Sequence, residues 1–259
     1  MIARNNLLVY AAGTLLIAIV GLIFADFALQ WQPVPAGVPM RTALVYTSNV
    51  LLAILAVATL LPRISARAIP ALATFYGIWA LVLHVPRIVA APGNISIWLG
   101  LAEILTLAVA GTMAWLTYHP DVLRRWVRTT QIVFSLCLFV YGASHFVYAD
   151  FTATMIPSWM PLPLFWAYVT GCGHLATGIS LLFNVATRLS TTLLTAMFAS
   201  FVLLLHVPRV LANLTTHAEW VMVGVSMALT GAAWIIRTVT VSSPPRVQRQ
   251  TFSREPVPK

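Results

Sequence analysis

Histidine side chains interrupt four of the apolar stretches in this sequence, and they are its first chemical signal. His84, His145, His174 and His206 lie within or close to runs that are otherwise apolar. An ionisable side chain inside a membrane span is costly and is therefore a candidate functional residue. Imidazole exchanges protons near neutral pH and binds metals. Proton exchange, metal binding, haem ligation and hydrogen bonding to a ligand are therefore the chemistries to consider.

Three of these histidines fall in the second half of the chain, beside other polar groups. Tyr141 and His145 are four residues apart and share a helical face with Tyr148. His174 lies ten residues into its apolar run, which corresponds to roughly 15 Å of helix. We expect a ligand-binding site here, with the following contributors: Tyr141, His145, Asp150, His174, His206 and Arg209.

The strongest pattern in the sequence is an internal repeat. Leu83-His84-Val85-Pro86-Arg87-Ile88 returns 122 residues later as Leu205-His206-Val207-Pro208-Arg209-Val210. Ala25-Asp26-Phe27 returns 124 residues later as Ala149-Asp150-Phe151, and a proline-rich turn follows each copy. His84 and Arg87 therefore join the candidate ligand-binding residues. Pro208 cannot donate an N–H, so a kink is expected in the helix beside His206.

Several ligands are open for this cluster. A metal site needs three or four convergent ligands, and the sequence has no His-x-x-His pair, so no metal site is predicted. A bis-histidine haem would use His84 and His206, which the repeat relates. A quinone-like or lipid-like ligand beneath the proline turns is favoured over haem, and the cofactor stays unknown. The remaining alternative is structural, with each histidine bridging two helices.

The amino-acid composition indicates the class of protein to which these residues belong. The chain has 259 residues, of which 60% are apolar and 8% are charged, with a formal net charge of +9. A soluble domain carries roughly 25% charged residues, so a soluble globule is excluded. The basic residues are too scattered for a nucleic-acid site. Eight runs reach the roughly 20 apolar residues that a bilayer crossing needs: 7–24, 41–61, 68–90, 95–118, 131–148, 164–183, 189–211 and 219–237.

These runs predict an all-α integral membrane protein with eight transmembrane helices, arranged as two parallel four-helix repeats. We place the first repeat at residues 1–128, the second at 129–240 and a basic cytoplasmic tail at 241–259. An even number of helices gives both repeats the same orientation, so a pseudo-two-fold axis along the membrane normal is expected. Gly21 stands opposite His145, and Asn49 is the nearest polar counterpart of His174. The second repeat is therefore expected to carry the site.

The cations divide unevenly between the two sides of the membrane. Twelve Lys and Arg residues fall on the side of the N-terminus, and only Arg41, Arg87 and Arg209 fall on the other. The positive-inside rule then predicts a protein of the cell membrane with both termini cytoplasmic and the polar site near the outer face. The lipid bilayer is its first expected partner, because the loop 124–128 and the tail are basic enough to contact anionic headgroups.

The second unit resembles the DoxX family of small four-helix membrane proteins. The resemblance rests on residues 142–146, 150–151, 155–163 and 168–179, and it covers most of 131–211. The family usually carries a glutamate in the helix after the proline turn, where this sequence has His174. The resemblance implies a four-helix fold and links to quinone-dependent sulfur oxidation, to redox-stress complexes with soluble oxidoreductases, or to assembly roles.

Together these patterns predict a membrane redox-associated subunit that binds a quinone-like or other hydrophobic ligand near the outer face. His145, His174 and His206 would hold the ligand with Arg209, while Asp150 and the tyrosines would exchange protons. A membrane or soluble redox partner is expected, and no nucleic acid. The alternatives are a non-enzymatic protein that binds or transports a small molecule, and an assembly subunit of a membrane complex. Whether the protein is an enzyme is left open.

Overall fold

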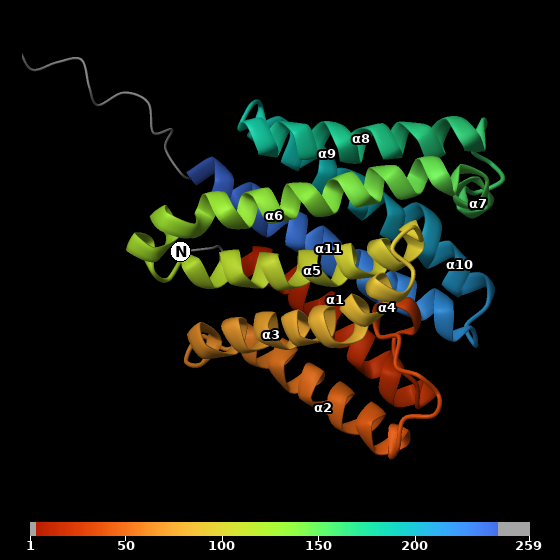
Figure 1. Cartoon of the computed structure of the whole chain (residues 1–259), viewed down its shortest axis with the longest axis horizontal. Helices are drawn as coiled ribbons and strands as arrows, with labels where there is room; N and C mark the ends of the chain where they lie inside the picture. The colour runs from red at the N-terminus through yellow and green to blue at the C-terminus, as the bar shows by residue number, and fades with distance from the viewer. Residues whose placement is uncertain (1–3, 243–259) are drawn as a thin grey trace, which may run out of the picture.

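The computed structural model describes residues 4–242, and helices account for most of them (Figure 1). No strand occurs in this part of the chain. Most of the predicted basic tail, from residue 243 onward, lies outside the described residues. The first half contains α1 (Arg4–Phe24), the 3-10 turn η1 (Leu29–Trp31), α2 (Arg41–Leu60), α3 (Ser65–Trp79), the π-helical segment η2 (Ala80–His84), α4 (Val85–Ala90) and α5 (Ile95–Leu116).

The second half contains the same kinds of element in nearly the same order. They are α6 (Pro120–Val147), α7 (Ala149–Met155), α8 (Pro163–Phe183), α9 (Thr187–Ser200), the π-helical segment η3 (Phe201–His206), α10 (Val207–Ala212) and α11 (His217–Ser242). The short helix α7 stands where η1 stands in the first half. The short helices α4, α7 and α10 all lie toward one end of the bundle (Figure 1).

Seven helical stretches of the described chain are long and apolar enough to cross a membrane. They are Leu7–Phe24, Arg41–Leu60, Ser65–Ala90, Ile95–Leu116, Pro120–Val147, Thr187–Ala212 and His217–Thr240. An all-helical protein with helices suited to a membrane is therefore what the chain forms, as its composition predicts. The eighth predicted run forms α8, which has 21 residues. Pro163 and His174 interrupt its apolar sequence, and α8 is not among the seven stretches given above.

The helix pairings of the first half recur in the second. Helix α1 packs on α2 and α3 packs on α5, just as α6 packs on α8 and α9 packs on α11. The two halves meet where α5 packs on α6 and where α11 packs on α1, and α5 also contacts α11. Residues far apart in sequence are therefore brought together at the junction of the two halves.

Glycines allow the closest of these helix contacts. A Cβ atom on Gly231 of α11 would overlap the backbone of Tyr10 in α1. Between α6 and α8, a Cβ on Gly171 would lie 2.9 Å from the Cβ of His145. The absence of a side chain at Gly171 thus lets α8 approach α6 closely, which places His174 of α8 beside His145 of α6.

Both repeated proline motifs coincide with a local widening of the helix. The π-helical segments η2 and η3 end at the repeated histidines, His84 and His206. Pro86 and Pro208 have no N–H to donate, so each releases a carbonyl in the preceding turn. π-Helical turns of this kind often occur at functional sites. A kink was expected beside His206, and the structure has a π-helical segment there.

The prediction of a loop at residues 124–128 was wrong, because α6 begins at Pro120 and includes them. Proline suits the first turn of a helix, and the negative charge of Asp121 in that turn favours the helix N-terminus. Arg128 Nη1 donates a hydrogen bond of 2.8 Å to the carbonyl of Leu181 near the end of α8. The same carbonyl also accepts a hydrogen bond of 2.8 Å from Gln131 Nε2. Arg128 and Gln131 together therefore hold the end of α8 against α6.

Candidate functional site

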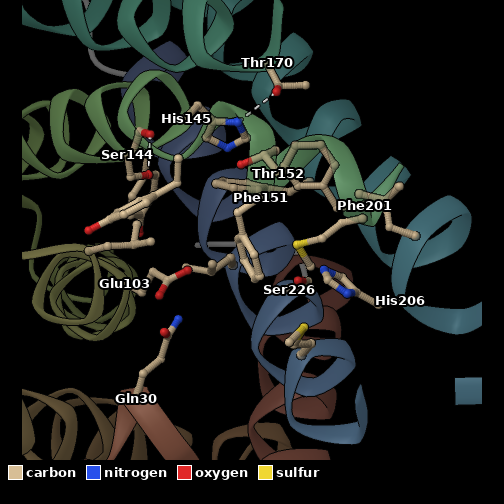
Figure 2. Close-up of a pocket in the computed structure, with 18 of the residues that line it drawn as sticks. Gln30, Glu103, Ser144, His145, Phe151, Thr152, Thr170, Phe201, His206 and Ser226 are labelled. Carbon is tan, nitrogen blue, oxygen red and sulfur yellow. Dashed lines mark hydrogen bonds between the residues drawn. The ribbon is translucent and has the colours of Figure 1, made fainter. Parts of the chain in front are cut away.

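A cavity of about 510 Å³ lies among the helices, and residues of the short helix α7 form part of its wall. Its wall combines residues of η1, α5, α6, α7, α8, α9, η3 and α11, so both halves of the chain contribute (Figure 2). Most of the wall is apolar and aromatic, including Leu99, Phe151, Phe198, Phe201 and Leu229. Small-molecule pockets in proteins are commonly built in this way, with a few polar groups set among apolar side chains.

His145 and His174 lie together on the cavity wall, as the sequence predicts. Their ring centroids are 5.2 Å apart. Thr170 Oγ1 and His145 Nδ1 lie 3.0 Å apart in a hydrogen bond that orients the His145 ring (Figure 2). His174 is only 2% exposed, and its Nδ1 has no hydrogen-bond partner. The ring centroid of Phe198 lies 5.4 Å from that of His174.

Tyr141 connects this histidine pair to helix α5. Its hydroxyl donates a hydrogen bond of 2.7 Å to Thr106 Oγ1, and its ring centroid lies 5.3 Å from that of His174. Tyr141, His145 and Tyr148 all line the cavity, so the helical face expected from their spacing is present. The tyrosine hydroxyl is held by α5 and therefore fixes the position of the aromatic wall next to His174.

His206 reaches the cavity from η3, whereas Arg209 does not line it. Arg209 is held by Glu219 of α11: its Nε lies 2.9 Å from Glu219 Oε2 and its Nη2 lies 2.7 Å from Oε1. This two-bond geometry is the strongest arrangement for an arginine and a carboxylate. Arg209 was predicted to hold a ligand head group, but the structure directs its guanidinium to Glu219 instead.

Glu103 of α5 is a cavity residue that the predicted site did not include. Trp31 Nε1 of η1 donates a hydrogen bond of 2.6 Å to Glu103 Oε2. Figure 2 shows the Glu103 carboxylate projecting toward the cavity from the wall that faces His145. A signal for this residue was available in the sequence, because Glu103 is the only acid well inside an apolar run.

His84 supports the turn that carries Trp31, and it does not line the cavity. Its Nε2 donates to the carbonyl of Trp31 at 3.2 Å, and its side chain is fully buried. A Cβ on Gly100 would lie 2.9 Å from His84 Cε1, so this glycine makes room for the ring. His84 therefore acts through Trp31, which it helps to hold against Glu103.

Two further predicted site residues lie outside the cavity. Asp150 is exposed in the first turn of α7, and Arg87 is exposed on α4. Neither has an ion-pair partner among the described residues. The structure thus brings Tyr141, His145, His174 and His206 together, and leaves out Asp150, Arg209, His84 and Arg87.

The first half has no comparable polar pair at the equivalent place. A Cβ on Gly21 would meet the side chain of Asn49, so these two residues contact each other where α1 packs on α2. His145 and His174 make the matching contact where α6 packs on α8. The sequence alignment of Gly21 with His145 and of Asn49 with His174 is consistent with this geometry.

The chemistry open to the cavity is hydrogen bonding and proton exchange with a small ligand. In residues 4–242, no group of three His, Cys, Asp or Glu side chains is placed to hold a metal ion. Imidazoles, a carboxylate and a phenol face an aromatic space of ligand size. The structure is therefore all-helical, with helices suited to a membrane and a cavity lined in part by histidines.

A family model described as a domain of unknown function, DUF8561, matches residues 134–237. The matched stretch extends from α6 to α11 and contains His145, His174 and His206, but it does not contain Glu103. No curated protein and no solved structure matches the chain. The chain is thus similar to this family over the half in which the sequence predicts the site.

Proposed function

We propose that the protein is a redox-associated membrane subunit that binds a quinone-like ligand in this cavity. The observation that carries the proposal is the meeting of His145, His174 and Tyr141 with aromatic walls around about 510 Å³. A quinone ring is planar and apolar, with oxygen atoms at its edge. It therefore suits imidazole and hydroxyl groups that are set between aromatic side chains.

The same geometry favours a quinone over a bis-histidine haem. A haem ligated by His84 and His206 needs a nitrogen of each ring directed at one iron. His206 lines the cavity, but His84 is buried outside it and its Nε2 is bonded to Trp31. The arrangement of these two histidines therefore supports a ligand that contacts His206 alone of the repeated pair.

We further propose that α8 is the eighth span and that the two halves are parallel repeats. The recurring helix pairings support a pseudo-two-fold axis that passes near the contact of α5 with α11. A matching hydrogen bond supports the same relation: Trp98 Nε1 donates to the Pro92 carbonyl at 2.8 Å, and Trp220 Nε1 donates to the Leu214 carbonyl at 2.9 Å. Both tryptophans lie at the start of the fourth long helix of their half.

The cation distribution supports a cell-membrane protein whose cavity faces the outer side. Arg63, Arg67 and Arg188 fall in turns or first helical turns at the end of the bundle opposite α4, α7 and α10. The positive-inside rule makes that end cytoplasmic, together with both termini. The resemblance of the second half to DoxX proteins adds a redox partner, membrane-bound or soluble, to this proposal.

A binding experiment tests the proposed ligand. The purified protein in lipid nanodiscs is titrated with decylubiquinone, and quenching of tryptophan fluorescence reports binding because Trp31 lines the cavity. Organic extraction of the purified protein, followed by chromatography, identifies any quinone that it retains. We expect saturable quenching and a co-extracted quinone.

Histidine variants connect this binding to the cavity. His145→Leu and His174→Leu remove an imidazole from the wall, and we expect each to weaken decylubiquinone binding at least about tenfold. His119→Ala is the matched control, because His119 is exposed at the opposite end of the bundle. Absence of saturable binding by the unaltered protein, or equal binding by all three variants, contradicts the proposal.

A further inference from the structure

Glu103 is the only acidic residue in the wall of the cavity, and no Lys or Arg of the described residues lines it. Its Oε2 accepts a hydrogen bond of 2.6 Å from Trp31 Nε1. Within residues 4–242 the carboxyl group forms no other hydrogen bond and no ion pair. Since the side chain projects toward the cavity (Figure 2), Oε1 is available to a ligand that enters it.

Aromatic rings line the space that Glu103 enters. They belong to the following wall residues: Trp31, Tyr141, Tyr148, Phe151, Phe198 and Phe201. The face of an aromatic ring attracts a cation, and the attraction is greater where the cation is away from water. An acid set among aromatic rings is therefore suited to an organic cation, and about 510 Å³ leaves room for a cation that carries apolar groups.

The protein supplies no cation of its own to this carboxyl group. Arg209 is held by Glu219, and Arg87 is exposed on α4 and does not line the cavity. An ionised carboxylate away from water is costly unless a cation accompanies it, so Glu103 keeps its proton unless a cation takes the place of that proton. Entry of a cation then breaks the O–H bond, leaves the electron pair on the carboxylate and passes the proton to water.

From this arrangement we infer that the cavity binds hydrophobic organic cations in exchange for the proton of Glu103. Quaternary ammonium and phosphonium compounds with apolar substituents form this class of ligand. The Glu103 carboxylate neutralises their charge, and the aromatic rings contact their substituents. The inference goes beyond the proposed function, because it adds a second class of ligand that depends on the α5 wall, whereas quinone binding depends on His145 and His174.

Proton exchange makes the affinity for a cation increase with pH, by up to about tenfold per pH unit. The other titratable groups of the wall are Tyr141, His145, Tyr148, His174 and His206. The elements α3, η2, α4 and α11 also pack on α5, and in the described part of the chain they add no titratable side chain to the wall. Protonated imidazoles would also repel a cation, but a histidine with its ordinary pKa of about 6.5 is largely uncharged at pH 7.5. Proton release at pH 7.5 therefore reports on Glu103.

Two ions of matched shape test the inference. Tetraphenylphosphonium and tetraphenylborate are similar in size but opposite in charge. Each is titrated by calorimetry at pH 7.5 into the protein in nanodiscs of zwitterionic lipid, and nanodiscs without protein give the partition into lipid. We expect tetraphenylphosphonium to bind at least about tenfold more tightly than tetraphenylborate. Titrations in two buffers that differ in enthalpy of ionisation should show release of about half to one proton for each cation bound.

Glu103→Gln removes the exchangeable proton and keeps the shape of the side chain and an oxygen for the Trp31 bond. We expect this variant to lose tetraphenylphosphonium affinity at least about tenfold and to release no proton. Asp121→Asn, which alters an exposed carboxylate outside the cavity, should keep both properties.

Equal binding of the two ions by the unaltered protein overturns the inference, and this comparison holds even if Glu103→Gln does not fold. Unchanged affinity and proton release in a folded Glu103→Gln variant also overturn it. Neither result bears on the proposed function, which the decylubiquinone titrations of His145→Leu and His174→Leu test separately.

Discussion

Trp31 and Glu103 are joined by a hydrogen bond of 2.6 Å that connects the turn η1 to helix α5 across 72 residues of sequence. Both residues line the cavity, and Glu103 is the only acidic residue of its wall in the described part of the chain. His84 stabilises the same turn, because its side chain donates a hydrogen bond to the Trp31 carbonyl. The first half of the chain therefore contributes to a site that the sequence assigns to the second half.

Trp31→Phe tests the contribution of this bond to stability. Phenylalanine keeps an aromatic ring but removes the N–H, so Glu103 loses its one donor. An intramolecular hydrogen bond contributes about 0.5–1.5 kcal/mol, and we expect the free energy of unfolding in detergent to fall by roughly that amount. Trp98→Phe is the matched control, since Trp98 Nε1 donates to Pro92 near the surface. An equal loss in both variants would show that the Trp31 bond has no special role.

Arg209→Gln tests the assignment of Arg209 to Glu219 rather than to the ligand. The variant leaves Glu219 without its partner, and the Glu219 side chain is only 12% exposed. Arg209 itself is 38% exposed, so solvent screening limits the expected loss of stability to about 1 kcal/mol. We expect decylubiquinone affinity to change by less than about threefold, because Arg209 does not line the cavity.

The repeat supplies the control for this variant. Arg87 matches Arg209 in sequence but has no ion pair among the described residues. Arg87→Gln should therefore leave stability within about 0.5 kcal/mol of the unaltered protein. Chemical unfolding followed by circular dichroism measures both. A tenfold loss of quinone binding in Arg209→Gln alone would restore the sequence-based assignment of Arg209 as a ligand residue.

Much of the helical architecture could be predicted from the sequence, because most of the long helices coincide with an apolar run. The exception is α6, which begins at Pro120 and includes the charged stretch that was expected to be a loop. The helical spacing of Tyr141, His145 and Tyr148 also predicted their common face. The partner of Arg209 could not be predicted, since Glu219 lies on another helix and only helix packing brings the two together. Glu103 shares this difficulty: its role depends on the pairing of α5 with α6 and on the path of η1, which no local pattern determines.

Gly231→Ala tests the close contact of α1 with α11. A Cβ atom at Gly231 would overlap the backbone of Tyr10, so the two helices would have to separate. Overpacking of this kind costs about 1–3 kcal/mol, and we expect thermal unfolding to begin at a lower temperature.

Gly77→Ala in α3 is the control, because nothing lies within 4 Å of a Cβ there. Alanine is the better helix former by about 1 kcal/mol, so Gly77→Ala should be neutral or stabilising. A stable Gly231→Ala variant would contradict the close contact.

The ion pair of Asp26 with Arg41, outside the cavity, predicts a dependence of stability on pH. Burial alone would raise the pKa of Asp26. The hydrogen bonds from Arg41 and from the Phe27 N–H, together with the charge of Arg41, lower this pKa by more than burial raises it. The net pKa in the folded protein is therefore below that of the unfolded chain, about 3.9. The stability that the pair contributes is fully present above the unfolded pKa and is lost as pH falls through the folded pKa.

We expect Asp26→Asn to be less stable than the unaltered protein at pH 7, and the difference to shrink below about pH 4. Asp150→Asn, at the matching position of the second Ala-Asp-Phe motif and without an ion pair in residues 4–242, should show no such convergence. Unfolding temperatures measured from pH 3 to pH 7 for the three proteins decide the matter, and a difference for Asp26→Asn that stays constant over this range would refute the role of the pair.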